Sequence, residues 1–329
     1  MLDTGLISDP RGLATATPCL IGHDSGQVMR ALDLRCLDGL DLRVLPDRGL
    51  DIGYAWFQGV PLAWRSRIGD TPPIRHPRDH QWNGAFGGGL LATCGMRNVG
   101  APSEGHGLHG EFDHTPASQV RVEQEHRDGQ VILRVTGVIE EMNALTTHLR
   151  CERVIETTTG TAQVVIHDTV TNLGPRTEAA PFLYHVNIGA PLWAPGARLH
   201  MSSEHVDPRD EDSAAHLSSW RDAPPVSADA PERVFEHRVT PDPDGWAHAE
   251  VVNTAIGMGV TIAWCTQALP RLHQWVHPIR GAYALGIEPA NCSLLGRAAD
   301  RENGTLPTLE PGQVRCTTVR VSARLLRST

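Results

Sequence analysis

The sequence predicts an all-β protein, built as a large antiparallel β-sandwich with few short helices. Apolar and polar residues alternate along many segments of strand length, and turn dipeptides such as Asp128-Gly129 separate consecutive segments. The chain contains 32 Gly and 24 Pro, which favours a turn-rich architecture. No long run shows the 3.6-residue apolar spacing of an amphipathic helix. We therefore expect antiparallel sheets packed face to face.

The expected elements follow one another along the whole chain. Strand patterns occur at 28–37, 40–45, 51–56, 60–65, 119–123, 131–139, 148–156, 162–172, 256–265, 282–288 and 314–325. Short helices are expected only at 214–221 and 271–276. Residues 202–244 are rich in Asp, Pro, Ser and Ala and predict a long loop or lid, because strand patterns resume after them. We expect one domain over residues 1–329.

Composition narrows the classes of partner. The net charge of −9 disfavours nucleic acid. The first residues lack the basic and apolar regions of a signal peptide, and no segment approaches the roughly 20 apolar residues that span a bilayer. The seven Cys include no CxxC pair, so neither a disulfide framework nor a zinc ribbon is expected. These observations predict a cytoplasmic protein with no membrane partner, and they are compatible with a homodimer.

Two titratable residues interrupt apolar, strand-like runs and form the candidate catalytic pair. Alternation over residues 181–189 places His185 and Asn187 on one face. A lone His would more often be a core residue, but two polar side chains favour a lined cleft, with Asn187 contacting the substrate. Glu288 follows the apolar run 283–287, where neighbours would raise its pKa unless it is an exposed edge residue. His185 and Glu288 together predict general acid/base chemistry.

Other polar residues suit a polyhydroxylated substrate. In the turn at residues 46–51, Arg48 offers a fork of donors and Asp51 accepts from hydroxyls, although a loop ion pair explains both equally well. His109 is expected to donate to the substrate, and Asn291 to bond a hydroxyl. Each Trp ring taken alone is more typical of a hydrophobic core, but several together could supply a flat apolar surface on which a sugar stacks. These rings belong to Trp56, Trp64, Trp82, Trp193 and Trp275.

The glycine-rich and histidine-rich segments each have a second interpretation. The glycines at 87–89 are not followed by the helix and Lys of a phosphate loop, so close backbone packing is expected there. Donors suited to Zn, Mn or Fe are available from His106, His109, Glu111 and His114. Their spacing matches no rigid ligand pattern, so we favour hydrogen bonding by His109 and expect neither a metal nor a cofactor.

The order of four short motifs along the chain resembles that of the aldose 1-epimerase (galactose mutarotase-like) superfamily, in particular its bacterial aldose 1-epimerase-like branch. The resemblance rests on Arg-Gly-Leu-Asp at 48–51, Leu-His-Gly at 108–110, Tyr-His-Val-Asn at 184–187 and Ile-Glu-Pro at 287–289, and extends over about residues 40–325. It implies a β-supersandwich with a sugar site on the concave face of the large sheet.

The resemblance also implies roles for single residues. His185 would be the acid, Glu288 the base and His109 a substrate-binding residue, and the reaction would interconvert the anomers of a small sugar by ring opening. For the superfamily's Asp that holds sugar hydroxyls, Asp207 and Asp210 are the nearest candidates. Two alternatives are kept, which are a metal-dependent sugar isomerase, epimerase or lyase, and a non-catalytic carbohydrate-binding protein.

Overall fold

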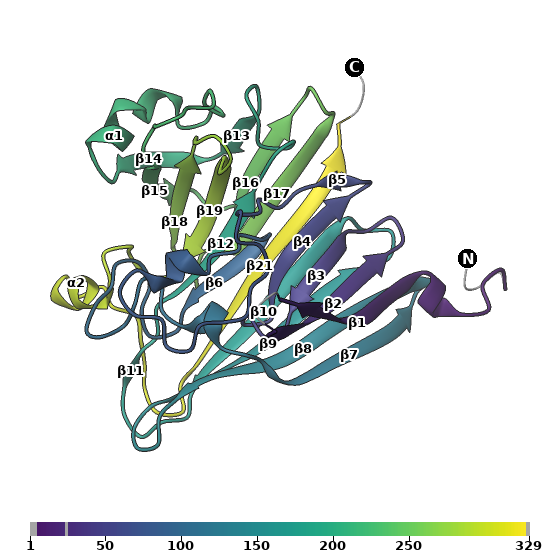
Figure 1. The fold of residues 1–329 in the computed structure, drawn as a ribbon, viewed down its shortest axis with the longest axis horizontal. Coiled ribbons are helices and arrows are strands. Elements are labelled where there is room, and N and C mark those ends of the chain that lie inside the picture. The colour runs from purple at the N-terminus through teal and green to yellow at the C-terminus, as the bar shows by residue number, and fades with distance from the viewer. Residues whose placement is uncertain (1–4, 24–25, 327–329) are drawn as a thin grey trace.

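The computed structural model describes residues 5–23 and 26–326, which form mainly two antiparallel sheets (Figure 1). In this described part the larger sheet has eleven strands, ten of which follow one another as hydrogen-bonded neighbours. Their order is β1 (Ala14–Gly22), β2 (Val28–Cys36), β3 (Asp41–Leu45), β4 (Asp51–Phe57), β6 (Leu91–Gly95), β12 (Phe182–Ile188), β19 (Ala284–Ala290), β18 (Arg271–His277), β15 (Arg233–Val239) and β14 (Ser203–Pro208), and β5 (Val60–Pro61) pairs with β4.

The second sheet has eight strands among the described residues. Their order is β13 (Arg198–Met201), β16 (Trp246–Asn253), β17 (Met258–Cys265), β21 (Val314–Leu325), β10 (Gln163–Asn172), β9 (His148–Thr158), β8 (Gln130–Met142) and β7 (Ser118–Arg127). The remaining elements are short, namely β11 (Glu178–Ala179) paired with β20 (Thr308–Leu309), the helices α1 (Glu211–Ala215) and α2 (Arg297–Glu302), and the 3-10 turns η1 (Pro10–Gly12), η2 (Gln81–Gly84), η3 (Phe112–His114) and η4 (Leu217–Ser219).

The two sheets share one hydrophobic core. Tyr184 and Ile287 of the larger sheet are buried in the same cluster as Ile155 and Val319 of the smaller sheet. The inward side chains alternate along each strand with side chains on the opposite face, which is the pattern of a sandwich. The predicted all-β sandwich with few short helices is therefore confirmed. Across the ranges 5–23 and 26–326, no helix is long and apolar enough to cross a membrane.

A buried ionic network ties the sheets together. Arg153 on β9 donates to Asp51 on β4 at 2.6 Å and to Asp168 on β10 at 2.7 Å. It also donates to the hydroxyl of Thr93 on β6 at 2.9 Å, while Tyr184 on β12 donates to Asp168 at 2.6 Å. Charges removed from water in this way need partners on every side, and each of these groups has them.

Three sequence predictions differ from the structure. Residues 271–276 were expected to form a short helix, but this segment is the strand β18, paired on both sides with β15 and β19. Residues 202–244 are not one long loop, because they contain β14, α1, η4 and β15. The expected helix near 214–221 begins earlier, as α1, since the carboxylate of Asp210 accepts from Ser213 N and caps it.

The glycines at 87–89 pack against backbone, as expected. A Cβ at Gly87 would lie 2.3 Å from the carbonyl oxygen of Gly69, and one at Gly89 would lie 2.6 Å from that of Ile52. Any side chain at either position would push the neighbouring segments apart. Gly89 therefore allows the loop before β6 to lie directly against β4, and Gly87 allows the same loop to lie against the backbone at Gly69.

Candidate active site

His185 and Glu288 are neighbours on adjacent strands at the middle of the larger sheet. The register that pairs Val186 of β12 with Ile287 of β19 places His185 directly across from Glu288. His185 Nε2 lies 3.1 Å from Glu288 Oε1. The next position on β19 facing the same way is Gly286, where a Cβ would lie 2.5 Å from Oε1 and 3.2 Å from the His185 ring. Glycine at 286 thus leaves room for the pair.

Burial controls the protonation of this pair. Only 5% of His185 and 2% of Glu288 is exposed. Burial raises the pKa of Glu288 to about 8, and the carboxylate of Glu232 adds to this effect. Burial lowers the pKa of His185 to about 3, and His109 contributes in the same direction. At neutral pH the site therefore holds a neutral imidazole beside a protonated carboxyl.

The pair has free hydrogen-bonding capacity. Although Nε2 and Oε1 are 3.1 Å apart, their geometry is not that of a hydrogen bond, and within the described residues Oε1 of Glu288 has no hydrogen-bond partner. Nδ1 of His185 also has none there. Buried polar atoms are normally paired, so atoms left open beside a cavity are typical of groups that bond a ligand.

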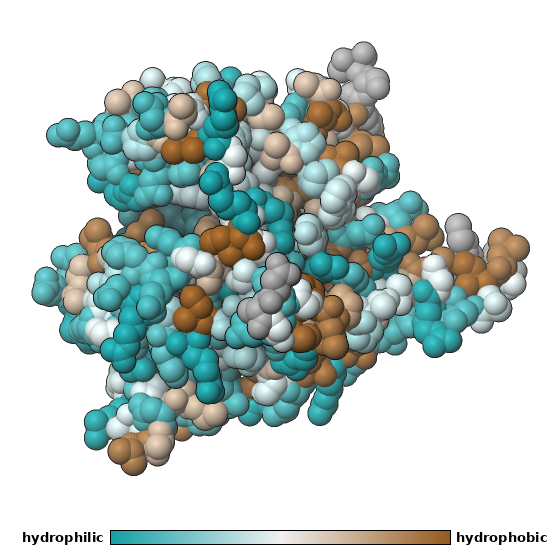
Figure 2. All heavy atoms as spheres, in the orientation of Figure 1, coloured by the Kyte–Doolittle hydropathy of each residue, from teal (hydrophilic) through white to brown (hydrophobic). Residues whose placement is uncertain are grey.

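The pair faces a cavity of about 490 Å³, within the usual size range of ligand sites. The space-filling view is hollowed between the part of the surface that contains α1 and the part that contains α2 (Figure 2). Aromatic rings form much of the wall, with the Trp82 and Phe86 centroids 4.2 Å apart and the Trp275 centroid 5.5 Å from that of His185. Flat apolar walls next to an acid/base pair suit a sugar ring, which has apolar faces and a polar edge.

Several polar residues also line the cavity, among them Arg209, Glu232 and His109. Arg209 and Glu232 begin and end the connection between β14 and β15, and Arg209 Nη1 lies 2.8 Å from Glu232 Oε1. The indole of Trp275 donates to the other oxygen of Glu232 at 2.9 Å. Nδ1 of His109 accepts from the backbone N–H of Gly100 at 3.4 Å, which leaves its Nε2–H as a donor. Burial lowers the pKa of His109 to about 4, so this ring is also neutral.

Of the residues predicted from the sequence, the structure brings His185, Glu288 and His109 to the cavity, together with two of the rings offered for stacking, Trp82 and Trp275. Arg209 and Glu232 were not predicted. Their signal was weak, because both are charged residues in a segment rich in charge. Asp207 and Asp210 do not line the cavity, since Asp207 pairs with His205 on the surface and Asp210 caps α1.

Four other predicted substrate-binding residues have structural partners instead. Arg48 forms a buried ion pair with Asp113 at 2.8 Å, and Asp51 belongs to the Arg153 network. Asn187 donates to the carbonyls of Gly89 and His185. Asn291 accepts from Phe182 N and donates to Ala180 O, which fixes the turn after β19. Their side chains do not line the cavity, so the prediction that they contact substrate is withdrawn.

The alternative metal site is not assembled. His106 contacts Arg297, Glu111 contacts His76, and His114 lies beside Asp113. Across the described residues, no group of three or more His, Cys, Asp or Glu is placed to hold a metal ion. His109 instead packs on Trp82, with ring centroids 4.6 Å apart.

Solved structures with the same fold define the class of protein. A Klebsiella pneumoniae protein provisionally named an aldose 1-epimerase matches with a TM-score of 0.89 and 23% identity, over 96% of this chain and 84% of its own. A galactose mutarotase-like protein from Clostridium acetobutylicum matches with a TM-score of 0.64 and 13% identity, over 94% and 99%. A galactose 1-epimerase from Lactobacillus acidophilus matches with a TM-score of 0.58 and 10% identity, over 95% and 99%. The chain therefore has the galactose mutarotase-like fold.

Within that class, the chain belongs to the family described as domain of unknown function DUF4432, whose model matches residues 26–323. No curated protein matches the chain. The predicted resemblance to the galactose mutarotase-like superfamily is confirmed at the level of the fold, and the reaction must be argued from the site.

Proposed function

We propose that this protein interconverts the anomers of a sugar, as an aldose 1-epimerase does, by general acid/base ring opening in the cavity that contains His185 and Glu288. The observation that carries the proposal is the contact between these two side chains. A carboxyl and an imidazole 3.1 Å apart, both buried and both with unpaired atoms, face one cavity walled by aromatic rings. The names of the structural neighbours support the same reaction class.

The reaction needs one proton on the pair. Between the pKa values of about 3 for His185 and about 8 for Glu288, the two groups together hold one proton. The protonated carboxyl of Glu288 gives its proton to the ring oxygen as the bond from C1 to that oxygen breaks. The neutral imidazole of His185 accepts the proton of the anomeric hydroxyl. The open aldehyde rotates about its C1–C2 bond, and reversal of both transfers closes the opposite anomer.

The other cavity residues position the sugar. The neutral His109 offers Nε2–H to a hydroxyl or to the ring oxygen. Glu232 is held by Arg209 and by the indole of Trp275, so its carboxylate is fixed at the wall, where it can accept from hydroxyls. Trp82 and Phe86 supply an apolar surface against which a sugar face can stack. Binding energy from these contacts would orient the anomeric centre toward the pair.

Polarimetry on freshly dissolved single anomers tests the proposal. The purified protein should accelerate the approach to the anomeric equilibrium for at least one of D-galactose, D-glucose, D-xylose and L-rhamnose. Glu288→Gln and His185→Ala should each lower this acceleration by about 10²–10⁴-fold, the usual contribution of a positioned acid or base. Circular dichroism should show that both variants remain folded. Unchanged rates in both folded variants would exclude this pair as the catalytic groups.

A further inference from the structure

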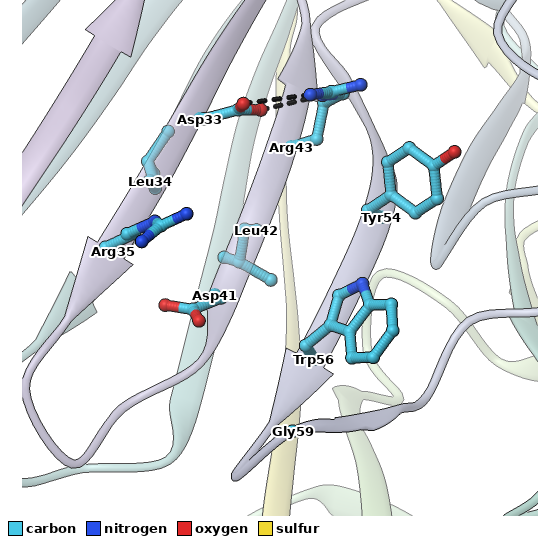
Figure 3. A pocket seen from close by; sticks show the side chains of 9 residues that line it. All are labelled: Asp33, Leu34, Arg35, Asp41, Leu42, Arg43, Tyr54, Trp56 and Gly59. Atoms are coloured by element: carbon cyan, nitrogen blue, oxygen red, sulfur yellow. Dashed lines mark hydrogen bonds and ion pairs between the residues drawn. The ribbon is translucent and has the colours of Figure 1, made fainter.

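A second hollow lies on the same sheet, away from the cavity. It has a volume of about 260 Å³ and is formed by the outer faces of β2, β3 and β4 (Figure 3). Tyr54 and Trp56 are two positions apart on β4, so both project outward, while Ala55 between them faces the core. Tyr54 is 37% exposed and Trp56 is 38% exposed. Two large rings left partly open at neighbouring positions are unusual for a surface without a ligand.

Polar side chains from the two adjacent strands border these rings. The register places Asp33 of β2 opposite Arg43 of β3, and Asp41 of β3 opposite Trp56. Arg43 donates to both oxygens of Asp33, at 2.7 and 2.8 Å (Figure 3). Arg35 also lines the hollow. The surface therefore presents an aromatic face with fixed donors and acceptors at its edge, which is the combination that a sugar ring requires.

The charges of this surface balance. Two guanidinium groups (Arg35 and Arg43) and two carboxylates (Asp33 and Asp41) line the hollow, and Arg43 pairs with Asp33. Beside the hollow, Arg65 pairs with Asp70 while stacking over Tyr54 at 4.1 Å. A surface for an anionic ligand would carry an excess of cations. Ion pairs of this kind suit a neutral ligand that bonds to donors and acceptors at once.

Aromatic residues continue from this hollow toward the cavity. A neighbouring hollow of about 400 Å³ shares Tyr54 and Trp56 with it and also includes Trp64. The Trp64 ring lies 5.6 Å from the ring of Trp275, which lines the cavity. Both hollows and the cavity therefore occupy one face of the larger sheet.

We propose that the hollow bordered by Tyr54, Trp56, Asp33, Asp41 and Arg43 is a second carbohydrate-binding site, in which a ring of a neutral glycan chain stacks on Trp56. This binding requires no catalysis, so the proposal can be tested independently of the acid/base pair. A glycan bound there would hold the protein close to polymeric carbohydrate while small sugars enter the cavity.

Affinity electrophoresis in gels that contain amylopectin, galactomannan or arabinoxylan tests this site. At least one of these neutral polymers should retard the native protein, and Trp56→Ala should weaken the retardation at least tenfold. Asp41→Ala should weaken it as well. Trp246→Ala is the matched control, because Trp246 is a partly exposed Trp that stacks on Arg320 in the other sheet. This control and Glu288→Gln should both be retarded like the native protein.

Several results would overturn the second site. The proposal is wrong if none of the three polymers retards the native protein, or if folded Trp56→Ala is retarded as strongly as the native protein. A loss of retardation in Glu288→Gln would assign glycan binding to the cavity instead. Retardation by polygalacturonate alone would show that the surface prefers an anionic chain. Sedimentation velocity would reveal the remaining alternative, because conversion of a dimer into a monomer by Trp56→Ala would identify this face as a subunit interface.

Discussion

Glu288 lies where an ionised carboxylate is poorly stabilised. Its pKa of about 8 compares with about 4.5 for an ordinary Glu, and Arg209 offsets the effect of burial only in part. Between these two pH values the folded protein retains a proton that the unfolded chain has released. The folded state therefore binds more protons, and the contribution of Glu288 to stability falls as pH rises from about 4.5 to about 8.

Replacing this carboxyl by an amide removes that dependence. Relative to the native protein, Glu288→Gln should gain stability as pH rises from 5 to 8, by up to about 4 kcal/mol, since each pH unit between the two pKa values corresponds to about 1.4 kcal/mol. Urea unfolding of both proteins at several pH values measures this difference. The comparison isolates Glu288, because other buried carboxyls are common to both proteins. A difference that is constant across this pH range contradicts the assigned protonation.

At the scale of elements, the sheets are held in register by buried ions as well as by apolar packing. Arg153 has no exposed surface and joins β9 to β4, β6 and β10. Arg153→Met would leave the carboxylates of Asp51 and Asp168 without their main counter-charge. Removal of one partner from such a buried set costs about 3–5 kcal/mol.

The matched comparison is Arg134→Met on β8 of the same sheet. Arg134 pairs with Glu125 and Glu156 near the surface, so its loss should cost about 1 kcal/mol or less. Urea unfolding measures both variants. Equal losses of stability in the two would show that the buried network adds nothing beyond an ordinary surface pair.

The strands of the site could be predicted from the sequence, but some of its residues could not. Alternation located β12 and β19, and an isolated His or Glu in an apolar strand indicated the pair. The same signature, a polar residue beside apolar ones, also describes Asp51 and Asn187, which fill buried hydrogen-bonding positions. Only the three-dimensional structure distinguishes a polar group that lines a cavity from one that forms hydrogen bonds within the protein interior.

Arg209 and Glu232 illustrate the second limit. They are 23 positions apart and meet because β14 and β15 pair at the edge of the larger sheet. β18 was missed for a related reason, since its strand identity comes from partners on both sides and its own apolar spacing is ambiguous. Long-range pairing of this kind leaves little trace in a local sequence pattern.

For the molecule as a whole, the sandwich provides a rigid support for chemistry. The strands that carry His185 and Glu288 lie inside the larger sheet, with neighbours on both sides, and their opposite faces form the core shared by both sheets. A site built on central strands keeps its geometry without a ligand. The connection between β14 and β15 adds Arg209 and Glu232 to one wall of the cavity, so the residues proposed to bind the sugar and those proposed to react with it come from different parts of the fold.

The most direct test of the acid/base assignment is selective-inversion proton NMR of an equilibrated sugar in deuterium oxide. Inversion of the anomeric proton of one anomer should be transferred to the other at a rate that depends on protein concentration, with no deuterium uptake at C2, because ring opening breaks no carbon–hydrogen bond. Glu288→Gln should return the transfer rate to that of the sugar alone. Deuterium at C2, or equal transfer rates for the native protein and folded Glu288→Gln, would contradict the proposed reaction.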